Sequence, residues 1–503
     1  MTEEELIANL RDPYWRIRNL YYIKDKEGKT ILFRPNDVQD EFIKNIWFRN
    51  VIPKARQRGF STVVQLLWLD TCLFNENIGA AIIAQDIDTA KAIRDEKIKF
   101  AYDRLPDVIR KMVPIKTDNV TKICWANGSF LVVALSARGL TLQRLHVSEY
   151  GKICAKYPDK AREIQTGAFP SVGQNGIIVV ESTAEGNEGP FYEMVQDAKA
   201  LQDSKKPLAK MDYRLHFASW WDADDYEAEP ERAIITEQDN RYFDTLETKI
   251  GRSISKRKRA WYVLKRKNDF GGDPAKMWQE FPSTIEEAFQ LSNEGAYLTD
   301  QLTAARKEGR IGHVPYDMRV PVNTFWDLGV NDDIAIWFHQ RVGQEDHFID
   351  FMEGTGEPYN YYVAQMQAKG YVYGKHYLPH DGLQRRPGTE VIKTSADMLA
   401  DLGLTNIEIV PRVAELTAGI QQLRMDFNHY WFDETACALG LKHLENYRKD
   451  WNDRMGVWST RPRHNGHQHA ADALRQKAQM ADEFKNTNQS NNTWRRPVGG
   501  MAV

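Results

Sequence analysis

Residues 51–64 read VIPKARQRGFSTVV, an apolar stretch followed by a basic turn and the start of an apolar helix. On the phosphate-loop pattern G-x-x-x-x-G-K-[ST], Gly59 is the second glycine and Ser61 is the hydroxyl residue. Lys54 stands in place of the first glycine, and Phe60 in place of the lysine. A loop that ends at a helix N-terminus offers backbone N–H groups to phosphate whatever its side chains are. The segment therefore predicts a phosphate-binding loop, the alternative being a basic turn before a helix.

A nucleotide at this loop needs a cation, and the sequence supplies more than one. Lys54 at the front of the loop is the first candidate, and Arg56 or Arg58 could replace it. The hydroxyl of Ser61 is a ligand of the kind that holds Mg²⁺ in phosphate loops. We therefore expect ATP to bind Lys54, Arg56, Gln57, Arg58, Gly59, Ser61 and Thr62, with Mg²⁺ on Ser61.

Two apolar runs downstream end in polar residues. In QRLHVSEYGK (143–152) the run ends at Glu149, and in IIVVESTAEG (177–186) it ends beside Ser182 and Thr183. Ligands of open α/β sheets bind at the carboxyl ends of strands. An ATPase needs a water-orienting group beside its Mg²⁺ site, and Glu149 fits that role. The metal-binding aspartate usual before it is Ser148 here. Taken alone, Glu149 would be a solvated surface residue.

Three aspartates in the second half of the chain suggest a metal site. FWDLGV places Asp327 on an apolar strand, where a carboxylate is costly to bury unless it is paired or holds a metal. YLPHDG places Asp381 at the end of another strand, and HQHAADALRQ places Asp472 near the start of a helix. Carboxylates from separate elements suit a phosphodiesterase that uses two metal ions. We expect Mg²⁺ or Mn²⁺ there, since both favour hard oxygen ligands.

Other side chains near these aspartates are second-rank candidates. The acidic ligand set makes zinc a weak alternative. Two of the histidines precede Asp472 and could orient water or phosphate, although a structural role is more common. The stretch RPRHNGHQHA before Asp472 contains no acid, which leaves the number of metals open. The second-rank candidates are Asp332, Asp333, His380, His467 and His469.

Basic residues offer contacts for DNA phosphates, which would be independent of sequence and sensitive to salt. The densest run is SKRKRAWYVLKRK (255–267), for which a solvated amphipathic helix is the alternative interpretation. Two arginines just beyond Asp381 could hold the scissile strand. The predicted DNA-binding residues are Lys256, Arg257, Lys258, Arg259, Arg385 and Arg386.

Length and composition fit an intracellular protein of several domains. A chain of 503 residues exceeds what one hydrophobic core usually organises. Its net charge of -3, from 67 Lys+Arg against 70 Asp+Glu, neither demands nor excludes nucleic acid. The four cysteines are far apart, so a disulfide framework or structural zinc is not expected. We expect neither a signal peptide nor contact with a membrane.

Apolar strands alternate with polar helical segments in both halves of the chain, which predicts α/β domains, with a largely parallel sheet in the first half. The expected strands of the first half include 80–84, 130–135, 145–147 and 177–180. The expected organisation is an N-terminal arm (1–32), a P-loop ATPase core (33–205), a helical basic subdomain or lid (206–295), a linker (296–319), a nuclease domain (320–482) and a disordered tail (483–503).

Four phrases together resemble the large subunits of tailed-bacteriophage terminases. KARQRGFST (54–62) is similar to the Walker A variant of that family, whose lysine stands at the front. SARGLTLQRLHVSEY (136–150) is similar to its arginine-bearing loop and Walker B strand. VVESTAEG (179–186) resembles its coupling motif, and EFPSTIEEAF (280–289) the phrase that joins motor to nuclease. The aspartate trio resembles the ribonuclease H-like nuclease of the same family.

The resemblance implies an ATP-driven motor that moves viral double-stranded DNA into procapsids and cuts concatemeric DNA with its metal-dependent endonuclease. It further implies that Arg138 is an arginine finger acting on a neighbouring subunit of a homo-oligomeric ring and that Gln39 reads adenine. Ser182 and Thr183 would pass the nucleotide state to the basic middle region, which moves the DNA. A loop arginine paired with a surface acid is the alternative for Arg138, and a helix-surface glutamine for Gln39. The implied partners are the portal protein and the terminase small subunit, in the host cytoplasm.

Two other functions remain open at this point. A stand-alone helicase–nuclease would usually carry two motor cores, whereas one phosphate loop is visible. A DNA-docking scaffold that no longer hydrolyses ATP is favoured by the missing Walker A lysine and Walker B aspartate.

Overall fold

The computed structural model describes residues 3–290, 295–328, 333–383, 393–412, 415–452 and 457–485. The chain divides into two compact units, Met1–Leu291 and Ser292–Val503, and each is described by itself.

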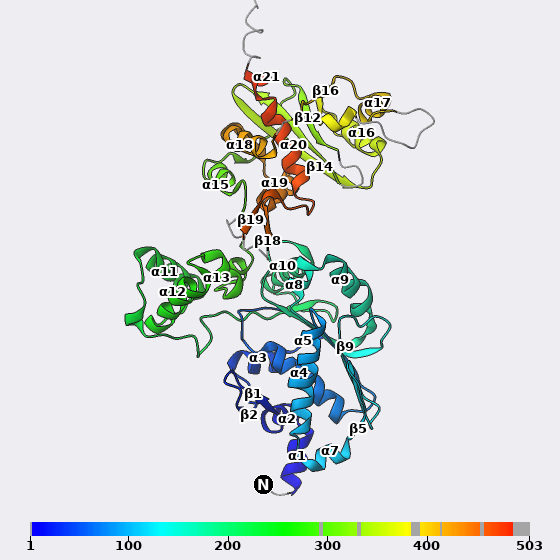
Figure 1. Ribbon diagram of the computed structural model, residues 1–503, viewed down its shortest axis with the longest axis vertical. Coiled ribbons are helices and arrows are strands. Elements are labelled where there is room, and N and C mark those ends of the chain that lie inside the picture. The colour runs from blue at the N-terminus through cyan, green and yellow to red at the C-terminus, as the bar shows by residue number, and fades with distance from the viewer. Residues whose placement is uncertain are drawn as a thin grey trace, which may run out of the picture. The chain divides into compact units, whose positions relative to one another are not determined.

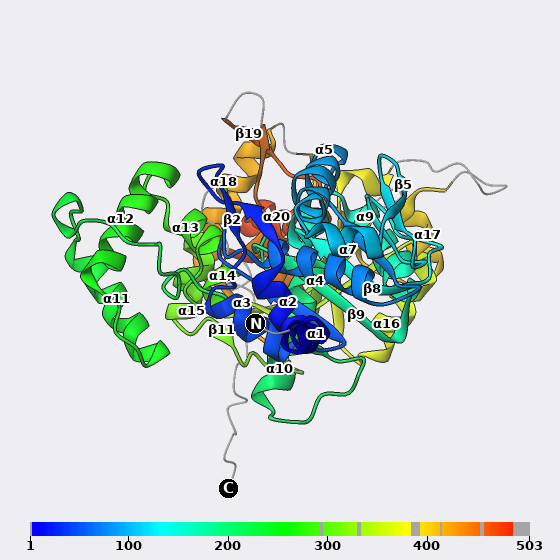
Figure 2. The ribbon, with the colours of Figure 1, turned by 90° about the horizontal axis from the view of Figure 1, so that it is seen from below.

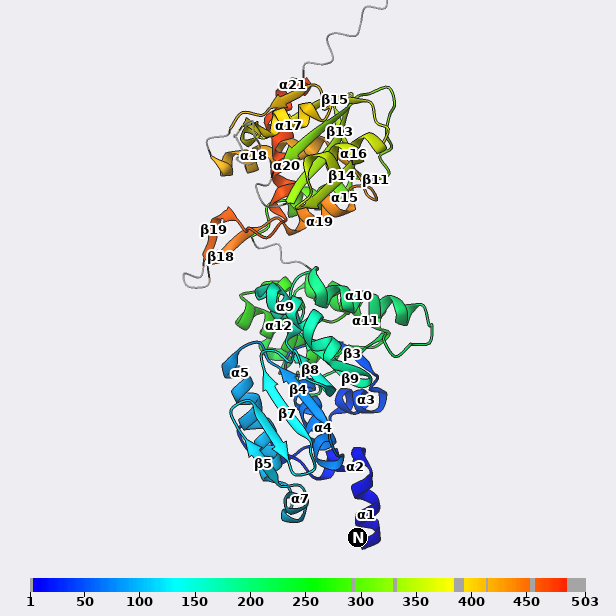
Figure 3. The same cartoon turned by 90° about the vertical axis from the view of Figure 1, so that its right-hand side faces the viewer.

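The N-terminal unit is built on an 8-stranded sheet in which the neighbours from β10 to β7 run parallel (Figure 1, Figure 3). The last two strands, β6 and β5, add antiparallel pairs at one edge. In sheet order the strands are β10 (Tyr213–Leu215), β3 (Arg49–Pro53), β9 (Val172–Ser182), β8 (Leu142–Ser148), β4 (Gly79–Ile83), β7 (Phe130–Ala134), β6 (Lys122–Trp125) and β5 (Ile115–Asp118). The four strands expected in this half are therefore confirmed.

Both faces of this sheet are buried, as parallel sheets require. Successive residues of β3 show the alternation: Ile52 packs in the cluster that contains Val63 and Trp68 of α4 (Phe60–Phe74), whereas Val51 packs in the opposite cluster. That opposite cluster includes Tyr150 of α8 (Tyr150–Lys156). The central strands are therefore fixed from both sides, which makes their carboxyl ends a rigid platform.

The remaining helices of this sheet domain precede or connect its strands along the chain. They are α1 (Glu3–Arg11), α2 (Pro13–Asn19), α3 (Asp37–Asn45), α5 (Ile87–Ala92), a π-helix (Ile93–Lys99), α6 (Phe100–Asp103), α7 (Asp107–Met112), α9 (Pro158–Glu163), a π-helix (Ile164–Ala168), a 3₁₀ turn (Phe169–Ser171) and α10 (Gly189–Asp203). A two-stranded sheet joins β1 (Tyr22–Lys24) to β2 (Thr30–Leu32).

The segment expected to be an N-terminal arm packs into the core instead. Arg16 of α2 donates to both carboxylate oxygens of Asp70 on α4, at 2.9 and 2.7 Å, and the hydroxyl of Tyr21 donates to Asp70 at 2.8 Å. Ile17 and Tyr21 are fully buried in the same cluster. The part of this segment from Arg16 to Tyr21 therefore belongs to the core of the sheet domain.

The second part of the N-terminal unit is helical, as expected, although β10 within it completes the parallel sheet. Its helices are a 3₁₀ turn (Pro230–Arg232), α11 (Glu237–Ile250), α12 (Lys256–Phe270), α13 (Pro274–Glu280) and α14 (Ile285–Ala288). In Figure 2, α11 and α12 run alongside each other. They enclose an aromatic cluster around Trp220, Phe243 and Tyr262.

The C-terminal unit contains a 7-stranded sheet that ends in the order β14-β13-β12-β15-β16. The first three of these strands are antiparallel neighbours, and β15 and β16 continue in parallel. With helices packed on this mixed sheet, the C-terminal unit is an α/β domain, as expected. The strands are β11 (Ile311–Gly312), β12 (Val322–Asp327), β13 (Asp333–Val342), β14 (Glu345–Thr355), β15 (Tyr373–Leu378), β16 (Ile407–Ile409) and β17 (Tyr430–Asp433), with the separate hairpin β18 (Lys449–Asn452) and β19 (Val457–Pro462).

Helices cover this sheet on both faces. Leu474 of α20 (Gln468–Gln479) packs in one cluster with Phe325 and Trp337, while Tyr362 of α16 (Tyr359–Ala368) packs in the other with Trp326. In Figure 1 the red helix α20 crosses the sheet near β12. The other helices are α15 (Thr299–Lys307), a 3₁₀ turn (His380–Leu383), α17 (Ser395–Asp401), α18 (Leu416–Asp426), a 3₁₀ turn (Phe427–His429), α19 (Ala438–Asn446) and α21 (Ala481–Lys485).

Two expected boundaries of this unit differ in the structure. The stretch 296–319, expected to be a linker, contains α15 and β11, and β11 pairs with β17 at the edge of the sheet. The expected tail from 483 onward begins inside α21, where Phe484 is buried. Residues 486–503 lie outside the described residues.

Among the described residues, no helix is both long and apolar enough to cross a bilayer. All four cysteines have free thiols, as expected from their spacing.

Candidate functional site

The predicted phosphate loop connects the buried strand β3 to α4. Lys54 continues the strand by a parallel bridge to Ala218. Gly59 then precedes α4 with φ +75°, a conformation that L side chains rarely adopt. A Cβ at Gly59 would also lie 2.4 Å from the amide nitrogen of Gln39. The sequence therefore makes a strand, a tight turn and a helix N-terminus, which is the local geometry of an anion site.

The loop is attached to the helical part of the same unit. Its backbone N–H groups at Ala55 and Arg56 donate to the carbonyls of Ala218 and Glu280, at 2.8 and 2.9 Å. The hydroxyl of Tyr226 donates to the carbonyl of Arg56 at 2.5 Å. A movement of the helical part would therefore be transmitted directly to this loop.

Lys54 is the cation of the loop that faces the ends of neighbouring strands. Its Nζ lies 3.1 Å from Glu181 Oε2, at the end of β9, and 3.4 Å from Glu149 Oε1, just after β8. Arg56 instead pairs with Glu280, and Arg58 donates to the carbonyl of Asp222. The geometry therefore favours Lys54 over the two arginines as the nucleotide-binding cation.

The two glutamates keep Lys54 charged in a buried position. Lys54 is only 6% exposed, and burial by itself would lower the pKa of its amine. The charges of Glu181 and Glu149 outweigh burial and raise the pKa of Lys54 to about 12. Burial would raise the pKa of Glu181, but Lys54 and His146 hold it well below its usual value.

Glu181 is the functional candidate that sequence reasoning missed. Its carboxylate is fully buried, and its Oε1 accepts hydrogen bonds from Ser61 at 2.6 Å and Ser148 at 2.8 Å. The Nε2 of His146 lies 3.3 Å from the same oxygen. Its signal in the sequence is VVESTAEG, where Glu181 directly follows the apolar run and precedes the two hydroxyl residues.

Those two hydroxyl residues lie beside the loop and beneath α8. The carbonyl of Ser182 accepts a hydrogen bond from the backbone N–H of Lys54 at 3.1 Å. A Cβ at Gly151 would lie 2.8 Å from the carbonyl of Thr183 and 2.9 Å from Ser182 Oγ, so α8 approaches this strand end closely. Ser182 and Thr183 thus join the phosphate loop to the helix that follows Glu149.

Gln39, predicted to read the adenine, is hydrogen-bonded to the phosphate loop and supports its conformation. Its Nε2 donates to the carbonyl of Gly59 at 2.7 Å, and its Oε1 accepts from the backbone N–H of Asn36 at 2.9 Å. The second contact belongs to the capping box that begins α3.

Arg138, the predicted arginine finger, lies on the loop between β7 and β8. Its side chain is 58% exposed, with Nε 3.4 Å from Glu163 and one terminal nitrogen 2.9 Å from Thr166 Oγ1. Within one chain, Arg138 is therefore paired with a surface acid, which is the alternative interpretation given for it above. Its exposure also leaves it accessible to a neighbouring copy.

The predicted DNA-binding residues of α12 mostly face acids of the same unit. Arg257 pairs with Glu227 and Glu229, and Arg259 with Glu247. The ammonium of Lys258 donates to backbone carbonyls at 2.8 and 2.6 Å. These partners neutralise much of the basic run, and the aromatic residues between the cations face the buried cluster, so α12 fits the description of a structural amphipathic helix. Arg385 and Arg386 lie outside the described residues.

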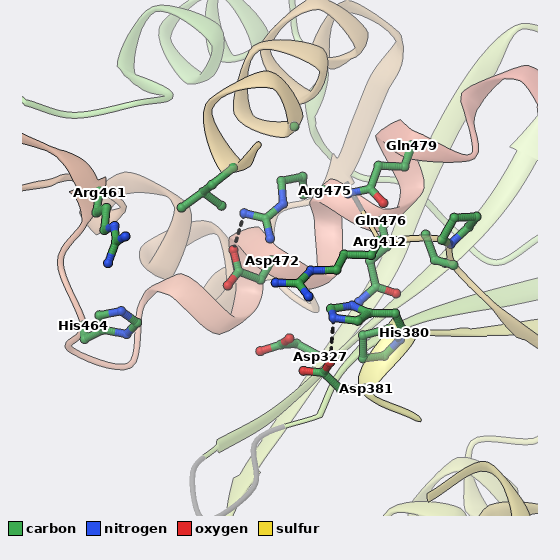
Figure 4. A pocket seen from close by; sticks show the side chains of 15 residues that line it. Asp327, His380, Asp381, Arg412, Arg461, His464, Asp472, Arg475, Gln476 and Gln479 are labelled. Carbon is green, nitrogen blue, oxygen red and sulfur yellow. Dashed lines mark ion pairs between the residues drawn. The ribbon is translucent and has the colours of Figure 1, made fainter. Parts of the chain in front are cut away.

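In the C-terminal unit, the three predicted aspartates line one cavity of about 560 Å³ (Figure 4). Asp327 ends β12, and Asp381 lies in the 3₁₀ turn after β15, the parallel neighbour of β12. Asp472 comes from the first turns of α20, which packs on β12. Figure 4 shows the carboxylates of Asp327 and Asp381 close together, with Asp472 facing them.

Each of these carboxylates is engaged by a nearby cation or histidine. Asp327 contacts His469 Nδ1 at 2.7 Å, and Asp381 contacts the second-rank candidate His380 at 2.7 Å. Asp472 pairs with Arg475 at 2.8 Å. Burial lowers the pKa of His469, but the hydrogen bond and charge of Asp327 outweigh this effect and raise it. Of the other second-rank candidates, His467 contacts His443 at 2.7 Å, and Asp333 accepts a hydrogen bond from the hydroxyl of Thr355.

The donor set suits a hard divalent cation. Burial and the nearby charge of Asp327 raise the pKa of Asp472 to about 6, as expected where carboxylates converge. The acids remain separately paired, and among the described residues no three His, Cys, Asp or Glu side chains are grouped closely enough to hold a metal ion. Metal binding would therefore require these acids to exchange their present partners. Asp332 lies outside the described residues.

Three arginines and a histidine that sequence reasoning did not single out also line this cavity: Arg412, Arg461, Arg475 and His464. Arg412 comes from a distant segment, whereas Arg461 and His464 precede α20 in the phrase RPRHNGHQHA and Arg475 follows Asp472 on α20. In Figure 4, Arg412 extends toward the space between Asp472 and His380. A pocket with acids on one side and arginines on another can hold a metal together with a phosphate.

Comparison with known proteins finds similarity among solved structures. The matched structures include large terminases of phages. That of a thermophilic bacteriophage, in complex with ADP, is 11% identical, with 88% of this chain and 97% of that chain covered and a TM-score of 0.32. The ATPase domain from a Thermus phage is 15% identical, covering 50% of this chain and 94% of its own, with a TM-score of 0.32.

The nuclease domain of the bacteriophage SPP1 large terminase, with bound Mn, is 13% identical. It covers 32% of this chain and 86% of its own, with a TM-score of 0.26. No protein-family model and no curated protein matches the chain.

Proposed function

We propose that the chain is a terminase large subunit, which hydrolyses ATP to move viral double-stranded DNA and cuts that DNA with a metal-dependent nuclease. The observation that carries this proposal is the convergence of Lys54, Glu149 and Glu181 at the ends of β3, β8 and β9. A phosphate loop, a cation and two carboxylates at one edge of a parallel sheet suit nucleotide hydrolysis. The aspartate-lined cavity of the other unit supplies the second activity.

At the ATP site, the backbone N–H groups around Gly59 would bind phosphate oxygens, and Lys54 would exchange its carboxylate partners for phosphate. Ser61 would hold Mg²⁺, which supplies charge neutralisation of the β- and γ-phosphates when bound. Glu149 would orient the attacking water and accept its proton. Gln39 would keep the carbonyl of Gly59 in place. The hydrogen-bonding groups of its side-chain amide that are not used in this way would contact the adenine.

Communication between ATP and DNA would begin at the same edge of the sheet. Ser182 touches the backbone of Lys54, and Thr183 touches α8 behind Glu149, so this strand end senses both sides of the nucleotide. The exposed Arg138 would act on the nucleotide of a neighbouring subunit, which makes a homo-oligomeric ring the active form. The portal protein and a terminase small subunit are the proposed partners, and the host cytoplasm the proposed location.

At the nuclease site, Asp327, Asp381 and Asp472 would hold Mg²⁺ or Mn²⁺, which activates water and stabilises the leaving oxygen when bound. The arginines of the cavity would hold the DNA backbone against these acids, and Arg385 and Arg386 are proposed to extend that contact. Phosphate contacts carry no base information, so cutting would show little sequence preference. His469 would keep Asp327 oriented through its 2.7 Å contact.

Two isosteric variants of the full chain test the proposal. Glu149→Gln is expected to abolish ATP turnover and leave plasmid cutting intact, whereas Asp381→Asn is expected to do the reverse. Glu193→Gln and Asp401→Asn, which change exposed carboxylates elsewhere on the two units, are the matched controls. Loss of both activities in each variant would contradict the assignment of two separate sites. Absence of ATP turnover in the unmodified chain, both with and without long duplex DNA, would instead favour a non-hydrolysing scaffold.

A further inference from the structure

Ser148 occupies the position at which phosphate-loop ATPases carry a metal-binding aspartate. In these enzymes the loop hydroxyl and that aspartate together hold Mg²⁺. Here β8 ends with Ser148 and Glu149 follows it directly, so this strand end offers one carboxylate where two are usual. The hydroxyl of Ser148 points to Glu181 and donates to it at 2.8 Å. The position of the absent carboxylate is thus adjacent to another carboxylate from a different strand.

The topology explains why Glu181 reaches this position. β9 lies between β3, which leads into the phosphate loop, and β8, which leads to Glu149. In the sheet register Glu181 pairs with Ile52 on one side and with Ser148 on the other. A glutamate side chain is one methylene longer than aspartate, which gives its carboxylate additional reach.

The contact with Ser61 indicates what Glu181 does there. Its Oε1 accepts the hydroxyl proton of Ser61 at 2.6 Å, while its Oε2 lies 3.1 Å from Lys54 Nζ. The carboxylate therefore touches both side chains of the loop that would meet the nucleotide. The side chain of Glu181 is fully buried, so its contacts with Ser61 and Lys54 belong to the interior of the domain and are not a surface ion pair.

From these contacts we propose that Glu181 replaces the missing Walker B carboxylate, positioning the divalent cation on Ser61 from the neighbouring strand. The inference rests on the proposed ATPase function and adds a residue to it. Glu149 keeps its role toward water, and Ser148 becomes a hydrogen-bond donor that orients Glu181. The two changes compensate each other: the carboxylate lost from β8 is present on β9.

A simpler role for Glu181 is that it only balances the charge of Lys54. The two roles predict different results for Glu181→Gln, which keeps the shape and can still bond both serines. If Glu181 only competes for Lys54, its neutralisation strengthens nucleotide binding equally with and without metal. If it positions the cation, the added affinity that the cation gives to nucleotide disappears, because affinity changes between two linked ligands are reciprocal.

The experiment measures the affinity of the full chain for a fluorescent ADP analogue in Mg²⁺ and in EDTA. We expect Mg²⁺ to tighten binding by about tenfold in the unmodified chain and by less than about twofold in Glu181→Gln. Binding in EDTA is expected to be equal or tighter in the variant, since Lys54 loses one competing carboxylate. Glu193→Gln, at an exposed glutamate of the same unit, is the control and should keep the full Mg²⁺ effect.

A rescue variant separates positioning from folding. Ser148→Asp combined with Glu181→Gln returns a carboxylate to β8, and the Mg²⁺ effect should recover to about fivefold or more. Should Glu181→Gln fail to fold, Glu181→Asp carries the test, because it keeps the charge beside Lys54 but shortens its reach to Ser61. The Mg²⁺ effect is then expected to weaken while binding in EDTA stays unchanged.

The outcomes are distinguishable. No binding of the ADP analogue to the unmodified chain would remove the proposed ATPase function itself. If the Mg²⁺ effect on binding stays normal in Glu181→Gln, or in Glu181→Asp where the first variant does not fold, only the role of Glu181 is wrong. The proposed ATPase function is then unaffected. Loss of the Mg²⁺ effect without recovery in the double variant would also reject the replacement of the Walker B carboxylate.

Discussion

Replacing Lys54 with methionine is expected to destabilise the N-terminal unit, because two carboxylates would lose their shared cation. The pKa of Lys54 rises from 10.5 to about 12 on folding, which corresponds to about 2 kcal/mol of stability at neutral pH. Because the folded pKa is the higher one, this stability is fully present below pH 10.5 and is lost as the pH rises through 12. Leaving a buried charge without its partner costs about 3–5 kcal/mol, so Lys54→Met should lose about 2–5 kcal/mol.

Hydrogen exchange of peptides from β8 and β9 measures this effect, since it reports the opening free energy of the N-terminal unit by itself. A double-mutant cycle with Glu181→Gln sharpens the test. The double variant removes both charges and should be more stable than the sum of the single losses by about 2 kcal/mol. If Lys54→Met lies within about 0.5 kcal/mol of the unmodified chain, or if the two losses simply add, Lys54 and Glu181 are not coupled as described.

Other expectations follow from the same contacts. Arg138→Ala should lower ATP turnover of the assembled ring by about 10³-fold without changing nucleotide affinity. Mixing Arg138→Ala subunits with Glu149→Gln subunits should restore part of the turnover. If no turnover is recovered, Arg138 does not act between subunits. Asp70→Asn removes the buried partner of Arg16 and should cost about 3–5 kcal/mol in urea denaturation, whereas a loss below about 1 kcal/mol would show that the pair is weak. Arg257→Gln should leave the salt dependence of DNA binding unchanged, because acids already neutralise Arg257; a slope reduced by about one unit would return α12 to the DNA interface.

Local sequence patterns were sufficient for the strands and for the loop between them. The run IIVV predicts β9 because a strand buried on both faces is continuously apolar. The turn before α4 is likewise visible, since Gly59 and Ser61 keep the spacing of a phosphate loop. The three aspartates could be named because each follows or begins a recognisable element. Their pairing with His380, His469 and Arg475 could not be anticipated with the same ease, since it depends on side-chain placement.

The parts that sequence reasoning missed depend on which elements become neighbours. Glu181 becomes a site residue only because β9 inserts between β3 and β8, a fact of sheet order that no local pattern contains. The basic run of α12 suggested DNA because its acidic partners, such as Glu227 and Glu247, come from other segments. The expected linker contains a strand of only two residues, β11, whose pairing with β17 is a long-range contact.

The central claim is that one chain holds two separate divalent-cation sites, one for ATP and one for DNA cleavage. Crystals of the full chain grown with Mn²⁺ and a non-hydrolysable ATP analogue would test it through anomalous scattering from manganese. The account predicts one peak bonded to Ser61 beside the nucleotide, with Lys54 Nζ moved onto a phosphate oxygen, and a second density among Asp327, Asp381 and Asp472. Manganese absent from both places, or a nucleotide bound away from Lys54, would contradict it.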